Sequence, residues 1–161
     1  MERIAVIGLG NISIRHRHNL KYLYPFASIY AMSASGQVAA SDVSDCDVFV
    51  SSVEELIQHR IELAIIASPA TLHAVHAIPL IKAGIPVLIE KPLAASLADC
   101  EAIQAASQEH NTPVAVGYCL RYLPSAMLMK DLLTDHKVGR CYHVQVETGQ
   151  YLPDWRPNKY F

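Results

Sequence analysis

The sequence predicts an α/β protein in which helices cover both faces of a doubly wound parallel sheet. Three observations support this fold class. Short apolar runs rich in β-branched residues alternate with segments of helical period, which is the pattern of successive β-α-β units. Most of these runs are continuously apolar, as expected of strands that are buried on both sides. A glycine-rich turn follows the first run, where a strand would lead into a helix.

Six strands are predicted in order along the chain. Each is a short apolar run bounded by turn residues or by a helical segment. The strands lie at about residues 3–7, 28–32, 47–50, 62–67, 86–89 and 113–116. Helices are expected in the intervals between them.

The predicted helices have recognisable ends. Residues 52–55 (S-V-E-E) have the form of a capping box, and residues 96–99 (S-L-A-D) are a weaker relative of it. A helix over residues 71–83 is closed by Gly84, a natural left-handed residue after a helix, and Pro86 prevents its continuation.

The pattern changes after the sixth strand. Residues 121–133 have helical period, Gly139 stops the helix, and residues 142–146 alternate like a half-buried antiparallel strand. We therefore expect the doubly wound domain over residues 1–117. The start of a second α/β domain, built on a mostly antiparallel sheet, is expected over residues 118–161.

Composition and charge exclude several classes of protein. Thirteen Lys and Arg against fifteen Asp and Glu give a net charge of -2, so no basic surface for nucleic acid is expected. The mean hydropathy is +0.20, but the apolar runs are far shorter than the roughly 20 residues that span a membrane. Met1 leads almost directly into the first strand, which leaves no room for a signal peptide and predicts a cytoplasmic protein. The four cysteines show no C-x-x-C spacing and are expected to be reduced thiols.

The glycine-rich turn is the first candidate binding element. It reads G-L-G-N-I-S from Gly8 to Ser13 and opens a helix, which is the context that a dinucleotide-binding fingerprint requires. Gly8 permits the tight turn, and Gly10 lets the backbone approach a pyrophosphate at the positive end of the helix. Ser13 stands where a third glycine would allow close packing of helix on strand. An ordinary β-to-α turn is the alternative, but the six-strand pattern favours nucleotide binding.

The second strand leads into a loop that bears on the choice of cofactor. An acid that would receive the adenosine ribose hydroxyls is missing at its end, where Ser33-Ala-Ser-Gly-Gln37 stands instead. Such a loop would accept a 2′-phosphate without repelling it, yet no Lys or Arg occurs between Lys21 and Arg60. The sequence therefore leans to NADP over NAD, and a plain loop of small residues remains an equal alternative.

Two further elements follow later strands at the same edge of the predicted sheet. The fourth strand leads into S-P-A-T-L-H from Ser68 to His73. His73 and His76 are three residues apart on one helix, but no third ligand with suitable spacing follows, so a metal site is not predicted. The fifth strand leads into Glu90-Lys91-Pro92. A lysine fixed there would reach a substrate hydroxyl, although by itself a solvated lysine is the simpler interpretation.

The four motifs together resemble the Gfo/Idh/MocA oxidoreductases. The motifs are G-L-G-N-I-S-I-R-H at 8–16, S-P-A-T-L-H at 68–73, E-K-P-L at 90–93 and G-Y-C-L-R-Y-L-P at 117–124. The resemblance covers nearly the whole chain, and E-K-P is its most specific part. It implies an N-terminal Rossmann domain and a C-terminal α/β domain on an open, mostly antiparallel sheet. It also implies hydride transfer between NAD(P) and a hydroxyl carbon of a sugar, sugar nucleotide or cyclitol.

The resemblance also implies roles for particular residues. The pyrophosphate would be held by Gly8, Gly10, Asn11 and Ile12, and the adenosine ribose would be surrounded by Ser33, Ser35 and Gly36. The cofactor cleft would be lined by Ser68, Pro69 and His73, with Glu90 facing the nicotinamide ribose. Lys91 would lie between nicotinamide and substrate as the catalytic residue. Trp155 and Arg156 would belong to a loop that closes over the cofactor. Cys119 departs from the family pattern, in which a larger residue such as Asn is common.

Members of the resembled family are longer, and their usual Asp and His acid-base residues would fall beyond Phe161. The chain is therefore expected to be either part of a sugar-type dehydrogenase or a dinucleotide-binding module or partner subunit without turnover. A methyltransferase with a Gly-rich first loop is a third possibility, but it has no use for the E-K-P element. Because the strand at 142–146 would lack most of its sheet, we also expect the chain to form homo-oligomers.

Overall fold

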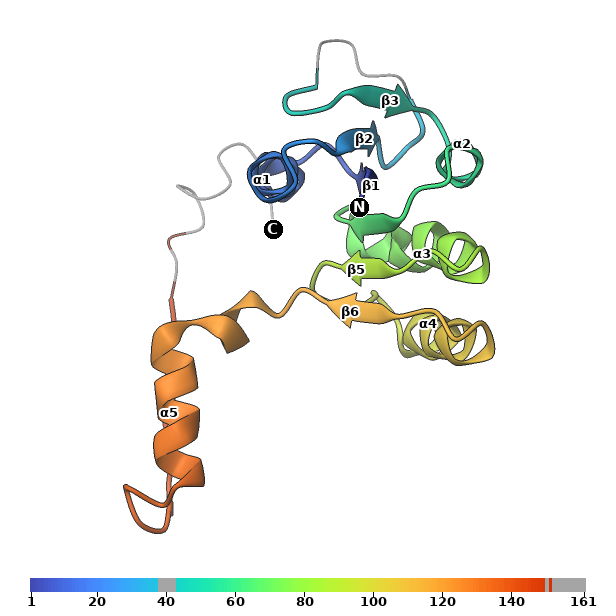
Figure 1. Ribbon diagram of the computed structural model, residues 1–161. Helices are drawn as coiled ribbons and strands as arrows, with labels where there is room; N and C mark the ends of the chain where they lie inside the picture. Colours follow the sequence, from blue (N-terminus) through green and yellow to red (C-terminus); the bar gives the residue numbers. More distant parts are fainter. Residues whose placement is uncertain (38–42, 150, 152–161) are drawn as a thin grey trace. The chain divides into compact units, whose positions relative to one another are not determined.

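The computed structural model describes residues 1–37, 43–149 and 151 (Figure 1). Its internal contacts divide the chain into two compact units, Met1–Tyr118 and Cys119–Phe161. The first unit contains the sheet and four of the helices. The second contains a single α-helix among the residues described there.

The first unit is built on one parallel sheet of six strands. The strands are β1 (Arg3–Ile7), β2 (Ser28–Met32), β3 (Val48–Val50), β4 (Leu63–Ile66), β5 (Val87–Ile89) and β6 (Val114–Val116). Their order is β3-β2-β1-β4-β5-β6, so the direction of winding reverses between β1 and β4. This is the strand order of a Rossmann fold, in which ligands bind at the carboxyl ends of the strands next to the reversal. All six predicted strands and the doubly wound fold class are confirmed.

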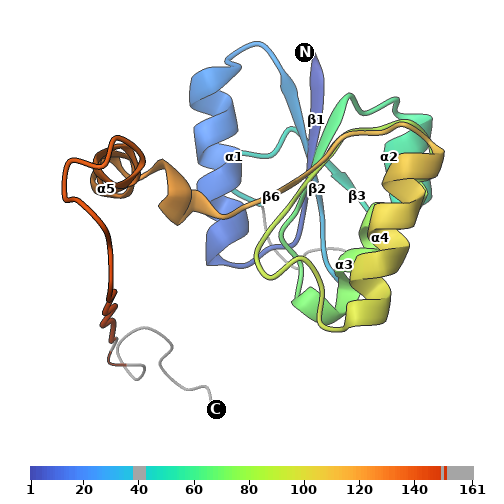
Figure 2. The same ribbon diagram turned by 90° about the horizontal axis from the view of Figure 1, so that it is seen from below.

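Helices cover both faces of this sheet, as the sequence predicts. The helices are α1 (Asn11–Leu23), α2 (Val53–Gln58), α3 (His73–Lys82) and α4 (Leu97–Glu109). Figure 2 shows α1 on one face and the other three on the opposite face. The β1 residues from Ile4 to Ile7 are all completely buried because β1 is central and covered on both sides. A continuous apolar run is therefore the expected sequence for this strand.

The two faces bury cores of different size. The smaller core lies under α1 and consists of Ile4, Val6, Leu20, Ala27, Ile29, Ile65 and Ala67. The larger core lies under α2, α3 and α4 and includes Ile7, Met32, Leu56, Ile66, Leu80, Ile89 and Ile103. The sheet is thus a rigid, dry support for the loops that leave its strands.

The predicted helix caps are present. The Ser52 hydroxyl accepts the Glu55 N–H at 3.2 Å, and the Ser96 hydroxyl accepts the Asp99 N–H at 3.1 Å. The Glu55 carboxylate reaches one residue further back than in a standard capping box and accepts the Ser51 N–H at 2.9 Å. Each cap satisfies an N–H group that the first turn of a helix leaves without an internal partner.

The helix predicted over residues 71–83 begins with a different geometry. Its first turn is the 3-10 helix η1 (Ala70–Leu72), and the α-helix starts at His73. It ends as predicted, because Gly84 adopts a positive φ of +76° and the Ile85 N–H donates to the Leu80 carbonyl at 3.0 Å.

The second unit differs from its prediction. The 3-10 helix η2 (Cys119–Tyr122) precedes α5 (Pro124–Thr134), so the α-helix expected from residue 121 starts at Pro124, a residue suited to the first helical position. The strand predicted at 142–146 is wrong, since residues 141–149 form no regular secondary structure. The described part of the second unit contains no strand that could form hydrogen bonds with residues 142–146. The self-association expected from that strand loses this basis, and the complete second domain stays a prediction.

No helix among the described residues is both long and apolar enough to cross a bilayer.

Candidate functional site

A cleft of about 530 Å³ opens where the winding of the sheet reverses. It is formed by the loops that follow β1, β2 and β4. Its lining consists of Gly8, Leu9, Gly10, Ala34, Ser35, Ala67, Ser68, Pro69 and Leu72. Five of these residues were predicted from sequence to bind a cofactor, and the structure brings them together. Ala34 lies within the stretch from Ser33 to Gly36 that was expected around the adenosine ribose, whereas Leu9, Ala67 and Leu72 were missed because an apolar residue beside a turn carries no signal of binding.

Gly8 is required by a close approach of two loops. Its φ is +117°, and a Cβ placed on it would lie 2.5 Å from the Ala67 carbonyl oxygen. The same Cβ would lie 2.9 Å from the Ser13 hydroxyl, which itself donates to the Ala67 carbonyl at 3.4 Å. Ser13 is completely buried and packs the helix close to the strand, as predicted for its place in the motif. Gly8 and Ser13 thus shape the cleft from its inner side.

Gly10 has the opposite surroundings. It is exposed at the N-terminus of α1, and a Cβ placed on it would meet no atom within 4 Å. No side chain caps this helix, and its first turn holds no acidic residue. By contrast, α2 and α4 each have a serine cap and at least one acidic residue in the first turn. The first turn of α1, with Asn11 and Ile12 exposed, is therefore open to an anion and suited to a pyrophosphate.

Arg17 contacts the backbone of the glycine loop through its buried guanidinium. Its role was not predicted from the sequence. Its side chain is 1% exposed, its Nε donates to the Ser44 carbonyl at 2.8 Å, and its Nη1 donates to the Gly8 carbonyl at 3.4 Å. Burial lowers the pKa of the Arg17 guanidinium, while Cys46 and Asp45 act in the opposite direction. Because α1 contains several basic residues, the sequence does not indicate that this one is buried beneath the glycine loop.

The loop after β2 is a tight turn. The Ser33 hydroxyl donates to the Gln37 carbonyl at 2.7 Å, and the Gly36 N–H donates to the Ser33 carbonyl at 3.2 Å. Gly36 has a φ of +72°, and a Cβ there would lie 2.7 Å from the Ser51 carbonyl oxygen. Ser33 is buried, whereas Ser35 is exposed and lines the cleft. Of the three residues predicted here, Ser35 is therefore the one with a hydroxyl open to a ligand.

His73 connects two loops behind the cleft. It is 1% exposed, and its Nε2 lies 2.9 Å from the Ser68 carbonyl oxygen. Its Nδ1 lies 3.1 Å from the carbonyl oxygens of both Pro92 and Leu93. The loop after β4 is thereby held to the loop after β5. The Ser68 hydroxyl is in turn 2.9 Å from His76 Nδ1, and burial, followed by the charge of His73, lowers the pKa of His76.

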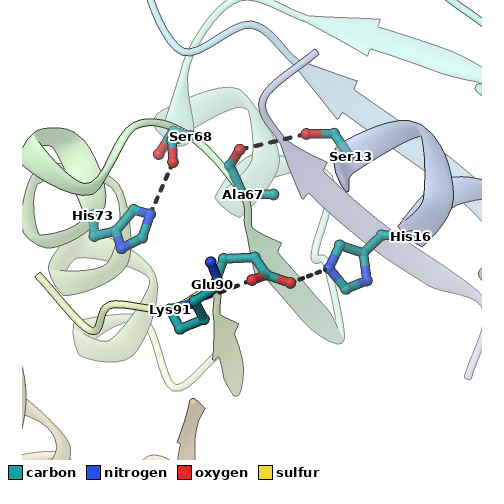
Figure 3. A network of polar contacts seen from close by, with 7 residues as sticks. All are labelled: Ser13, His16, Ala67, Ser68, His73, Glu90 and Lys91. Atoms are coloured by element: carbon teal, nitrogen blue, oxygen red, sulfur yellow. Dashed lines mark hydrogen bonds and ion pairs between the residues drawn. The ribbon is translucent and has the colours of Figure 1, made fainter. Parts of the chain in front are cut away.

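Glu90 and Lys91 lie at the carboxyl end of β5, and Figure 3 shows the contacts around them. The Glu90 carboxylate is 2.8 Å from Nε2 of His16 on α1 and accepts the Lys91 N–H at 3.2 Å. Gly117 leaves room for this carboxylate, since a Cβ there would lie 3.3 Å from Glu90 Oε1. The Lys91 side chain is exposed. His16 was not singled out from sequence, although it stands in the glycine-rich motif itself.

The remaining predicted site features are the loop with Trp155 and Arg156 and the expected lack of a metal site. Trp155 and Arg156 lie outside the described residues. Within residues 1–37, 43–149 and 151, no three His, Cys, Asp or Glu side chains are grouped as metal ligands.

The fold and cleft define a dinucleotide-binding protein of the Rossmann class, and comparison with known families agrees. Residues 2–118 match the Gfo/Idh/MocA oxidoreductase family with its NAD-binding Rossmann fold. The match spans well over half of the chain. The chain therefore belongs to this family, as its motifs indicate.

Several inositol dehydrogenases are similar in sequence. A myo-inositol dehydrogenase of Streptomyces leeuwenhoekii is 30% identical over 145 residues, which are 89% of this chain and 43% of that protein. An inositol 2-dehydrogenase of Saccharopolyspora erythraea is 33% identical over 143 residues, covering 85% and 42%. An NADP-dependent scyllo-inositol 2-dehydrogenase of Bacillus subtilis is 26% identical over 160 residues, covering 96% and 44%. The chain thus spans less than half the length of these relatives.

Solved structures agree with the fold. The scyllo-inositol dehydrogenase of Lactobacillus casei, solved with NAD(H) and scyllo-inositol, is 25% identical with a TM-score of 0.73. That comparison covers 86% of this chain and 42% of the other. The myo-inositol 2-dehydrogenase of Lactobacillus plantarum, at 21% identity over 86% of this chain and 42% of its own, has a TM-score of 0.75 and shows the same fold.

Proposed function

We propose that the chain is the cofactor-binding portion of an oxidoreductase that transfers hydride between NAD(P) and a hydroxyl carbon of a sugar, sugar nucleotide or cyclitol. The observation that carries this proposal is the uncapped, glycine-lined N-terminus of α1 at the reversal point of the sheet. Similarity to several inositol dehydrogenases supports a polyhydroxylated substrate.

The residues of the cleft divide the binding of a dinucleotide among them. The first-turn N–H groups from Asn11 onward hold the pyrophosphate, and Gly10 allows it to come close. Ser35 presents a hydroxyl to the adenosine ribose. Ser68 and Pro69 line the opposite wall of the cleft. His73 positions the loops after β4 and β5, because its ring nitrogens contact backbone carbonyls of both loops and are not available to the cofactor.

Lys91 is the proposed catalytic residue. When bound, the nicotinamide group donates or accepts the hydride. Lys91 lies in the loop after β5, at the edge of the sheet where ligands bind, and its exposed side chain is free to contact a substrate oxygen. We expect it to orient that oxygen and to move a proton to or from it as the hydride is transferred.

The proposed cofactor is NADP in preference to NAD. The loop from Ser33 to Gln37 carries no acidic side chain that would repel a 2′-phosphate, and the exposed Ser35 hydroxyl would donate to it. NADH binding at least tenfold tighter than NADPH would reverse this preference.

Calorimetric titration of the 161-residue chain with NADPH and NADH tests the proposal. We expect binding by the wild type and none by Gly10→Val, because the added side chain occupies the approach to the helix N-terminus. Gly149→Val is the matched control, since Gly149 is likewise without neighbours within 4 Å but lies outside the cleft. Unchanged affinity in Gly10→Val, or absence of binding by the wild type, would contradict the proposal.

Turnover separates an enzyme from a dinucleotide-binding module without catalysis. In a longer form that includes a second domain, Lys91→Ala should reduce turnover by roughly two to four orders of magnitude, the range for a positioned proton transfer. Cofactor affinity should stay within a few-fold. Normal turnover by Lys91→Ala would exclude the catalytic role, and binding without turnover in the longer wild type would favour the module.

A further inference from the structure

The Glu90 carboxylate has two polar contacts and lies close to Gly117. His16 Nε2 contacts one oxygen at 2.8 Å, the Lys91 N–H donates to the other at 3.2 Å, and Gly117 leaves the space that the group occupies. The side chains of His16 and Glu90 are only 18% and 16% exposed. An acidic group so enclosed, in a loop that leaves the sheet at its binding edge, has a fixed position relative to any ligand there.

The fold determines which part of a dinucleotide this carboxylate faces. In a Rossmann sheet, each half of the strands receives one mononucleotide, and the pyrophosphate lies between them at the reversal point. The adenosine ribose belongs to the loop after β2, so the nicotinamide belongs to the half formed by β4, β5 and β6. Glu90 directly follows β5 and pairs its N–H with the Ile66 carbonyl of β4 at 2.9 Å.

We propose that His16 is a positioning residue that holds the Glu90 carboxylate at the nicotinamide end and thereby makes the site favour oxidised over reduced dinucleotide. The inference rests on the proposed function. The oxidised nicotinamide ring carries a positive charge and the reduced ring is neutral, so a fixed carboxylate discriminates between them by charge alone. A carboxylate released into water would discriminate less, because solvent screens its interaction with the ring.

His16 has the reach and location for this role. It lies on α1, the helix whose N-terminus forms the pyrophosphate site, so the contact with Glu90 ties that helix to the end of β5. Lys91 is the nearest cation in sequence to Glu90, but its side chain is exposed and its charge is screened more strongly. Among the described residues, His16 is the only one whose side chain forms a hydrogen bond with the Glu90 carboxylate.

The experiment compares the affinity of the chain for NAD⁺ with that for NADH, or for NADP⁺ with NADPH if the phosphorylated pair binds better. Glu90→Gln should shift the ratio toward the reduced form by about tenfold, since it removes the charge but keeps the shape. His16→Ala should shift it in the same direction by about threefold or more. His16→Gln, which retains a donor near the position of Nε2, should stay within about twofold of the wild type.

Two controls distinguish positioning from a general structural effect. His18→Ala alters an exposed histidine of the same helix, which contacts Asp45 at 3.6 Å, and should leave the ratio unchanged. In a Glu90→Gln background, His16→Ala should cause no further shift, because His16 acts through Glu90. If His16→Ala does not fold, His16→Asn replaces it, because the shorter Asn side chain does not reach Glu90.

Each outcome decides the proposal. It is overturned if Glu90→Gln leaves the ratio unchanged, if His16→Ala leaves it unchanged while Glu90→Gln shifts it, or if the two shifts add in the double variant. Failure of the wild type to bind either form would instead refute the proposed function itself. Binding of both forms with a ratio that no variant alters would refute only the role of His16 and Glu90.

Discussion

Replacing Gly8 by alanine should destabilise the fold, whereas the same change at Gly10 should not. The two glycines stand two residues apart in one motif, but only Gly8 has a positive φ, at +117°, and a crowded Cβ position. Its Cβ would lie 2.5 Å from the oxygen and 2.8 Å from the carbon of the Ala67 carbonyl, both backbone atoms that no rotamer change can move. Gly10 has a φ of -75° and empty space around it.

The magnitude follows from two contributions. An alanine held at the φ of Gly8 costs about 1 to 3 kcal/mol in backbone strain. Separating the β1 loop from the β4 loop to admit a methyl group costs about 1 to 3 kcal/mol more, as overpacking of a dense interior does. The expected loss of about 2 to 6 kcal/mol is a large part of the roughly 5 to 15 kcal/mol that stabilises a typical domain. For Gly10→Ala we expect a net change within about 0.5 kcal/mol, because the loss of a preferred N-cap residue is offset by the lower entropy of the unfolded chain.

Urea unfolding followed by far-ultraviolet circular dichroism measures both changes. The midpoint should fall sharply for Gly8→Ala and stay near the wild-type value for Gly10→Ala, with similar slopes in all three proteins. If Gly8→Ala unfolded at the wild-type midpoint, the close contact with Ala67 would not exist in solution. Equal losses in the two variants would refute the division of the motif into a structural glycine and a ligand-binding glycine.

Three further changes should have measurable effects. His73→Phe keeps a ring but leaves buried carbonyls without a donor, so unfolding should need about 2 to 4 kcal/mol less, and a loss under 1 kcal/mol in urea would contradict the bridging role. Ser52→Ala removes a helix cap and should cost about 1 kcal/mol by the same assay, with no change in cofactor affinity. Although burial opposes it, the Ile29 N–H and the Lys21 ammonium hold the pKa of Asp47 below its ordinary value. The stability that this group contributes is therefore complete above the unfolded pKa and is lost as the pH falls through the folded pKa. Asp47→Asn should flatten the decline of stability as the pH falls below about 4, and an unchanged decline in acid would contradict this.

The doubly wound sheet and the ends of several helices could be predicted from the sequence alone. The strands at 3–7 and 28–32 were predicted without error because burial on both faces leaves a short apolar run, and its length and flanking residues distinguish it from a helix. Ser52, Ser96 and Gly84 marked helix ends because capping depends on atoms within three or four residues of one another. The glycine motif was recognised for the same reason, since its residues are close in sequence, although the contact of Gly8 with Ala67 depends on the fold.

Features that depend on residues far apart in the chain became visible only in the folded structure. The pairing of His16 with Glu90 joins positions separated by 74 residues, and the contact of His73 with Pro92 joins the start of α3 to the loop after β5. The strand predicted at 142–146 failed for a related reason, because a strand exists only where another strand supplies its hydrogen bonds. Local pattern reports which conformations a segment prefers, but the partner of a carboxylate, a carbonyl or a strand edge is settled only when the whole sheet has brought distant segments together.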